Sequence, residues 1–200
     1  VDDASKHSHN CYESKMHITV SMKNNYKEDL KLKSPNSKII SLLVSEVILG
    51  YEYFCLTQHF LDGPLLATEK SELDRIFPPP YYEWFQYNKD FTKFNNLDKA
   101  FSFIDDYMEK NGPFDGLLGF SQGGVLCAAV VCYQMKGVML RNHPPISFII
   151  SISGIKFRDP ELSAFLYAPP IKCPSVHITG AKDYGKELCL ELIQAFENPL

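Results

Sequence analysis

The sequence lacks the features that direct a protein to a membrane or to nucleic acid. No stretch reaches the ~18–20 apolar residues of a membrane span, and the most apolar early run, Ile39 to Leu49, is interrupted by polar residues. The net charge is −4 and no cluster of Lys or Arg is present, so binding to phosphate backbones or anionic lipids is not expected. The polar N-terminus has no signal-peptide layout. We therefore expect no nucleic-acid partner and no membrane span.

Paired cysteines are also absent, although the sequence contains six cysteines. They are scattered, with no C-x-x-C motif and no histidine at zinc-like spacing, which argues against a metal site. Cys127 and Cys132 lie in apolar runs, where free cysteine behaves as a small hydrophobic residue. Reduced thiols of this kind suit a cytoplasmic protein, with the nucleus as a further location.

The chain has 200 residues, which suits one hydrophobic core. Residues 1–38 are polar and show no sustained period, and we interpret them as poorly ordered or loosely attached. We divide the chain into a divergent N-terminal segment, residues 1–50, and one globular domain, residues 51–200. Because the first residue is Val1 rather than Met, we interpret the chain as a fragment, a processed product or an incomplete gene model. Composition gives no indication of an oligomeric state.

Strand and helix patterns alternate along residues 51–200. Short apolar runs bounded by turn residues predict strands, and apolar residues at helical spacing predict helices. Strands are predicted at 53–61, 114–119, 146–152 and 175–179, and helices at 97–110, 125–136 and 185–196. This alternation predicts the α/β class, with a mostly parallel sheet and helices on both faces.

The run Gly119-Phe120-Ser121-Gln122-Gly123 matches the G-x-S-x-G pattern, with a predicted strand directly before it and a helix directly after it. In such a turn the serine hydroxyl is exposed, and Gly119 and Gly123 avoid clashes between strand and helix. The backbone N–H of Gln122, at the start of the helix, would stabilise an oxyanion. The pattern predicts a nucleophile elbow with Ser121 as nucleophile. The alternative is a glycine-rich junction in which the serine only caps the helix.

A serine nucleophile needs a base, and the base needs an orienting carboxylate. In chains with this elbow the order is serine, acid, histidine, with the acid in a loop after a later strand. Asp183 follows the predicted strand 175–179 and fits that place. Its alternative is a surface-loop aspartate. Asp159 is a rival acid, but Arg158-Asp159-Pro160 is more typical of a turn.

From about residue 60 to its end, the chain resembles the FSH-type serine hydrolases, a family related to the ovarian-cancer-associated candidate tumour-suppressor hydrolase. The resemblance rests on Phe60-Leu61-Asp62-Gly63-Pro64, Pro79-Pro80-Tyr81-Tyr82-Glu83-Trp84-Phe85, the run from Gly112 to Gly123, Ser153-Gly154, and Cys173-Pro174-Ser175-Val176-His177. It implies an α/β-hydrolase fold and hydrolysis of esters or thioesters of small acyl substrates. It also implies Ser121 as nucleophile, Asp183 as triad acid, and no cofactor.

Two parts that the resemblance leads us to expect are missing, so we expect an incomplete fold. Members of the family open with a strand ending in a His-Gly loop that supplies a second oxyanion N–H, and residues 1–53 contain no His-Gly pair. Members end with a Gly-His motif that supplies the base, and no histidine follows Asp183. Residues 39–49 are a candidate for the missing strand. The alternative function is a catalytically inactive, hydrolase-like binding or interaction protein.

Other histidines are weak candidates for the base. His177 lies within a predicted strand, where we expect it to pack or to bond locally. His143 precedes a strand, which places it at the opposite end of the sheet, whereas His59 precedes a turn and would lie nearer the active-site edge. His7, His9 and His17 are in the N-terminal segment.

The aromatic segment 78–85 has two interpretations. Its three prolines exclude a regular helix or a central strand, which leaves an ordered loop. In one interpretation Tyr81, Tyr82, Trp84 and Phe85 wall an apolar acyl pocket beside the nucleophile. In the other they cover the sheet edge.

Overall fold

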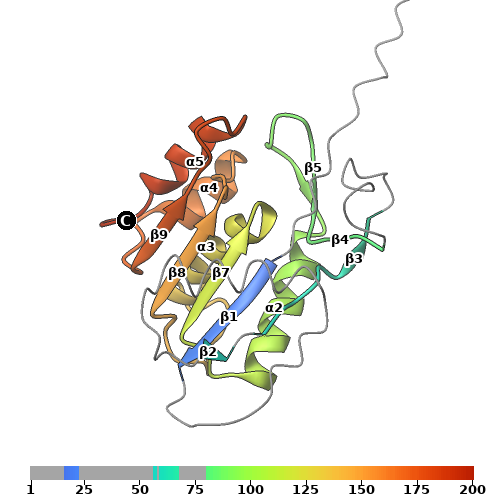
Figure 1. The fold of residues 1–200 in the computed structure, drawn as a ribbon, viewed down its shortest axis with the longest axis vertical. Coiled ribbons are helices and arrows are strands. Elements are labelled where there is room, and N and C mark those ends of the chain that lie inside the picture. Colours follow the sequence, from blue (N-terminus) through green and yellow to red (C-terminus); the bar gives the residue numbers. More distant parts are fainter. Residues whose placement is uncertain (1–15, 23–55, 58, 68–79) are drawn as a thin grey trace, which may run out of the picture.

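The computed structural model of the chain describes residues 16–22, 56–57, 59–67 and 80–200, and the side chains of residues 59–67 and 80–200. Its main sheet has five strands in the order β2-β1-β7-β8-β9 (Figure 1). These strands are β1 (Met16–Met22), β2 (Leu56–Thr57), β7 (Gly116–Phe120), β8 (Phe148–Ile152) and β9 (Ser175–Ile178). The last three are parallel neighbours, whereas β1 runs antiparallel to both β7 and β2.

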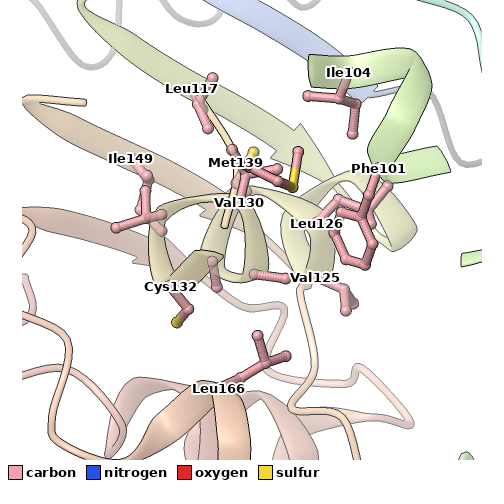
Figure 2. Close-up of a cluster of buried hydrophobic side chains, with 14 of the residues drawn as sticks. Phe101, Ile104, Leu117, Val125, Leu126, Val130, Cys132, Met139, Ile149 and Leu166 are labelled. Atoms are coloured by element: carbon pink, nitrogen blue, oxygen red, sulfur yellow. The ribbon is translucent and has the colours of Figure 1, made fainter. Parts of the chain in front are cut away.

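Four helices are described: α2 (Leu97–Asn111), α3 (Gln122–Met135), α4 (Pro160–Tyr167) and α5 (Lys186–Ile193). All four contribute to one hydrophobic cluster, together with Leu117 of β7 and Ile149 of β8. Figure 2 shows these two strand residues on the side of the sheet where α3 presents Val125 and Val130. Since side chains alternate along a strand, Leu118 and Ile150 point to the other face, where they form a second, small cluster.

The helix α3 is central to the core because it is apolar on all sides. Every residue from Gln122 to Cys132 is buried, including two cysteines. A helix that is hydrophobic all round is stable only when neighbours cover it, and here β7, β8 and α4 do so. The tight packing at its N-terminus fixes the turn that precedes it.

Two small antiparallel pairs lie outside the main sheet. β3 (Leu65–Leu66) pairs with β4 (Tyr82–Glu83), and β5 (Gln86–Tyr87) pairs with β6 (Phe94–Asn95). The described part of the aromatic segment is thus an ordered connection with short strands rather than a regular element. In Figure 1 the β5 hairpin stands near the end of the sheet toward which β7 and β8 point.

The α/β class is confirmed, as are β7, α3, β8, β9, α2 and α5 to within a few residues of their predicted limits. The predicted strand 53–61 is described as a strand only at β2. The interpretation of residues 1–38 as poorly ordered is wrong for 16–22, because these residues form β1 beside β7. Residues 39–49, the candidate for the missing strand, lie outside the described residues. The domain boundary at residue 50 stays a prediction, as do helices on the second face of the sheet.

The turn predicted at Arg158-Asp159-Pro160 is instead the start of α4. The Asp159 carboxylate accepts a hydrogen bond from the Leu162 N–H at 2.8 Å, and Pro160 occupies the first turn. Both are standard helix-start signals. Among the described helices, including α4, none combines the length and apolarity needed to span a membrane.

Candidate active site

Ser121 occupies a strained turn between β7 and α3. Its backbone has φ 55° and ψ −119°, a conformation that residues with a side chain rarely adopt. The turn is held in place because the Ser121 N–H donates a 2.8 Å hydrogen bond to the carbonyl of Ile152, at the end of β8. The side chain makes no capping hydrogen bond to α3. This last observation argues against the helix-capping alternative.

Close backbone contact at this turn explains the predicted elbow glycines. A Cβ atom on Gly119 would collide with the backbone of Gly123, so strand and helix approach each other more closely than a side chain permits. A second contact of this kind joins Gly124 of α3 to Gly154 after β8, where a Cβ on Gly124 would lie 2.9 Å from the Gly154 Cα. The two contacts hold the N-terminus of α3 against the ends of β7 and β8.

The side chain of Gln122 has a position that the sequence did not indicate. Its Oε1 accepts a 2.9 Å hydrogen bond from the Trp84 N–H, and its Nε2 donates a 2.9 Å bond to the Phe85 carbonyl. Gln122 is buried, and both of these bonds are buried as well. The residue directly after Ser121 therefore fixes the aromatic segment against the elbow.

A cavity of about 1030 Å³ opens over Ser121. Its size lies at the upper end of the usual range for small-molecule sites. Ser121, Gln122 and Asp183 all line it, although they follow two different strands, β7 and β9. The predicted nucleophile, oxyanion residue and acid thus share one cavity at the carboxyl ends of β7 and β9.

Asp183 is half-buried in the loop between β9 and α5. Its Oδ1 accepts a 2.8 Å hydrogen bond from the Gly185 N–H, and its own N–H donates to the Gly180 carbonyl at 3.0 Å. These bonds fix the carboxylate at the cavity wall. Asp159, by contrast, uses its carboxylate to cap α4 and is not among the described residues lining the cavity.

Only one of the four aromatic residues predicted for the pocket lines this cavity. Phe85 does so, whereas Tyr81 and Trp84 are buried in other surroundings and Tyr82 is 38% exposed. The remaining aromatic wall comes from residues that the sequence did not single out: Tyr87, Phe91, Phe94, Phe120, Phe157 and Tyr184. The short β5–β6 hairpin, which has no sequence period, carries the first three to the cavity.

The three histidines with described side chains lie away from Ser121. His143 Nε2 accepts a 2.8 Å bond from the Phe114 N–H, before β7 begins. His59 Nδ1 lies 2.8 Å from the Tyr107 hydroxyl, and its ring contacts Phe114, so the expectation that it lies near the active-site edge is wrong. Among the described residues that line the cavity, none is a histidine.

His177 is held on β9 by local contacts, as predicted. Its Nε2 lies 3.1 Å from Ser175 Oγ, and its ring packs edge-on against Phe196 with centroids 4.8 Å apart. Burial lowers the pKa of His177 to about 4 from an ordinary value of 6.5. The imidazole is therefore neutral at physiological pH, but it is engaged elsewhere.

The four cysteines with described side chains are free, in agreement with the prediction of reduced thiols. Burial raises the pKa of Cys132 to about 12 and that of Cys173 to about 11, and it raises the pKa of Cys127 further still. None of these thiols ionises near neutral pH, and none lines the cavity. Ser121 is the better candidate for a nucleophile.

A strained serine between a buried strand and a buried helix, opening into a cavity, defines the nucleophile elbow of the α/β-hydrolase class. Residues 52–199 match the model of the serine hydrolase (FSH1) family. The chain belongs to this family.

Individual relatives agree with that assignment. Family of serine hydrolases 3 from Saccharomyces cerevisiae is 32% identical over 148 residues, covering 68% of this chain and 55% of that protein. Esterase OVCA2 from Xenopus tropicalis is 36% identical over 108 residues, covering 53% of this chain and 42% of that protein. A Schizosaccharomyces pombe protein named dihydrofolate reductase is 31% identical over 140 residues, covering 62% of this chain. The chain spans between 30% and 55% of the length of these three relatives.

Proposed function

We propose that this chain carries the nucleophile and acid of a serine hydrolase that cleaves ester or thioester bonds of small acyl substrates. Ser121 attacks the carbonyl carbon, the Gln122 N–H stabilises the resulting oxyanion, and Asp183 orients a histidine base that is not among the described residues lining the cavity. The observation that carries this proposal is the strained backbone of Ser121 at the mouth of a cavity that Asp183 also lines. The esterase and serine hydrolase names of the relatives support the same chemistry.

The arrangement suits acyl transfer for a physical reason. A turn held at φ 55° keeps the hydroxyl out of the helix and in the cavity, so attack on a bound carbonyl needs little rearrangement. The free N–H groups at the start of α3 point positive dipole ends toward the same space. Removing one such donor from an oxyanion site typically slows acyl transfer by about 10²–10³-fold.

We also propose that the protein is located in the cytoplasm, with the nucleus as a further location. The support for this location is that the four described cysteines are free, three of them buried, which suits a reducing compartment.

A second candidate function is a hydrolase-like protein without catalytic activity. It is favoured by the positions of His59, His143 and His177, none of which reaches the cavity. Loss of the base from a triad leaves only a residual ~10³–10⁴-fold acceleration over water. The two candidates therefore differ in rate by several orders of magnitude.

Hydrolysis of 4-nitrophenyl butyrate and of a matched butyryl thioester tests the proposal. The chain, its Ser121→Ala variant and its Ser153→Ala variant are compared, with and without added imidazole. Ser153 is the matched control, because it also lines the cavity at a positive φ. We expect turnover that Ser121→Ala removes and Ser153→Ala retains, with imidazole raising it if the chain contributes no base. Equal turnover by the folded chain and by Ser121→Ala, with imidazole present, would favour the inactive protein.

A further inference from the structure

The cavity over Ser121 is richer in cations than the chain as a whole. The sequence has 20 Lys and Arg against 24 Asp and Glu, so the protein is slightly acidic. The charged residues among the described cavity lining are Lys89, Lys156, Arg158 and Lys182 on one side, and only Asp90 and Asp183 on the other. The balance of charge is therefore reversed at the site.

These cations come from three separate segments that meet at the cavity. Lys89 lies in the β5–β6 hairpin, Arg158 in the segment after β8, and Lys182 in the loop after β9. The first two segments are tied together, because the Arg158 N–H donates a 3.2 Å hydrogen bond to the Phe91 carbonyl. The cations therefore meet at the cavity through the fold and do not belong to a single charged helix face.

Three of the four cations remain available to a ligand. The Lys156 ammonium lies 5.2 Å from the centroid of the Tyr167 ring, which occupies it. Lys89, Arg158 and Lys182 are exposed, and none of them has a side-chain ion pair with another described residue. A bound anion would thus meet cations that no described carboxylate neutralises.

The inner wall of the cavity is aromatic. Phe157 packs against Phe94 with ring centroids 4.7 Å apart and against Phe85 at 5.9 Å. Phe85 and Phe157 are buried, whereas the three cations are exposed. The cavity is therefore amphipathic, with an apolar interior and a cationic rim.

We propose, building on the function proposed above, that the site selects substrates in which an apolar acyl chain is joined to a negatively charged group. The acyl chain lies against Phe85, Phe94 and Phe157, and the anionic group lies among Lys89, Arg158 and Lys182. The charge is either a carboxylate at the far end of the acyl chain or a phosphate on the leaving group. Attraction at this exposed rim is screened by salt, so selectivity falls as ionic strength rises.

Equilibrium binding to the Ser121→Ala protein tests this selectivity without any catalytic step. One pair of probes is monomethyl suberate, which has one carboxylate, and neutral dimethyl suberate. The other pair is octyl phosphate and octanol. Each exposed charge contact contributes up to about a fivefold change in affinity, so we expect the anionic member of at least one pair to bind roughly tenfold more tightly at low salt. The pair that shows the difference identifies the source of the charge.

Variants of the rim provide the control. Lys89→Gln combined with Arg158→Gln should remove most of the preference, whereas Lys99→Gln on the exposed surface of α2 should retain it. Equal binding within both pairs, no binding of any probe, or the same preference in the double variant would overturn the proposal. Because binding is measured without Ser121, these results are independent of turnover: an active enzyme with no charge preference contradicts only this inference, and an inactive chain with the preference contradicts only the proposed function.

Discussion

At the residue scale, Gln122 links the reacting centre to the wall of the cavity. The sequence predicted a role for its backbone N–H only, because the G-x-S-x-G pattern leaves this position open. The structure adds two buried hydrogen bonds from its side chain to the backbone of Trp84 and Phe85. A residue whose two amide atoms meet a carbonyl and an N–H acts as a positioning residue for the aromatic segment.

Replacing Gln122 with Leu should therefore affect both stability and the site. The change leaves a buried N–H and a buried carbonyl without this partner, at a cost of about 1–3 kcal/mol for each group. Gln134→Leu is a matched control, because Gln134 also bonds to backbone groups but lies away from the cavity. Urea denaturation should show that both variants are destabilised, while only Gln122→Leu raises the KM for 4-nitrophenyl butyrate. Equal KM values in the two variants would argue against a positioning role.

The low pKa of His177 predicts that the unfolding free energy of the protein depends on pH. Because the folded state holds this pKa near 4 and the unfolded state near 6.5, the folded state binds fewer protons between these values. The stabilisation that the folded state gains from a neutral His177 is fully present above about pH 6.5. It is lost as the pH falls toward 4. Since His177 is only half-buried, we expect a loss of about 1 kcal/mol rather than the full value implied by the shift.

Comparison with His177→Phe measures this contribution, since phenylalanine keeps an aromatic ring beside Phe196. The unfolding free energy of each protein is measured at pH 7 and at pH 4.5, and the native protein should lose about 1 kcal/mol more than the variant over this interval. Parallel losses in the two proteins would mean that the ring titrates normally in the folded state.

At the scale of elements, the start of α4 distinguishes the roles of the two candidate acids. Asp159 caps α4, and Asp183 lines the cavity. Asp159→Ala should lower the unfolding free energy by about 1 kcal/mol through loss of the cap, and leave the labelling rate of Ser121 unchanged. Asp183→Asn should slow that labelling by roughly 10⁴-fold, because the base loses its orienting carboxylate. The reverse pattern, measured with a fluorophosphonate probe, would assign the acid to Asp159.

Elements with a strong local signal were predictable. β7, the turn at Ser121 and α3 combine a short apolar strand, two glycines and a fully apolar helix, and each of these signals is contained in neighbouring residues. The helix α4 also had a local signal, Asp159 followed by Pro160, but the same pair is common in turns. β3 to β6 have two residues each, too few to show a period, and their pairing depends on distant partners.

At the scale of the whole molecule, the parallel arrangement of β7, β8 and β9 brings the candidate site together. Parallel strands end at the same edge of a sheet, so Ser121 after β7 and Asp183 after β9 had to meet there. That much followed from the order of elements in the sequence. The identity of the aromatic wall did not follow, because it depends on how the β5–β6 hairpin folds over the cavity.

The position of β1 is also a property of the whole sheet. Met16, His17 and Val20 pair antiparallel with β7, with a register irregularity between His17 and Val20. The sequence of this segment gave no reason to choose it over residues 39–49. A strand of mixed polarity is selected by its neighbours in the sheet more than by its own pattern.

The most direct test of the central claim is to map the adduct that a fluorophosphonate probe forms with the folded chain. Intact-mass measurement gives the stoichiometry, and peptide sequencing gives the modified residue. Our account predicts one adduct per chain on the Ser121 hydroxyl, blocked in advance by an excess of butyrate ester and retained in Ser153→Ala. An adduct on any other residue, or no adduct on a folded chain supplied with imidazole, would contradict the claim that Ser121 is an activated nucleophile.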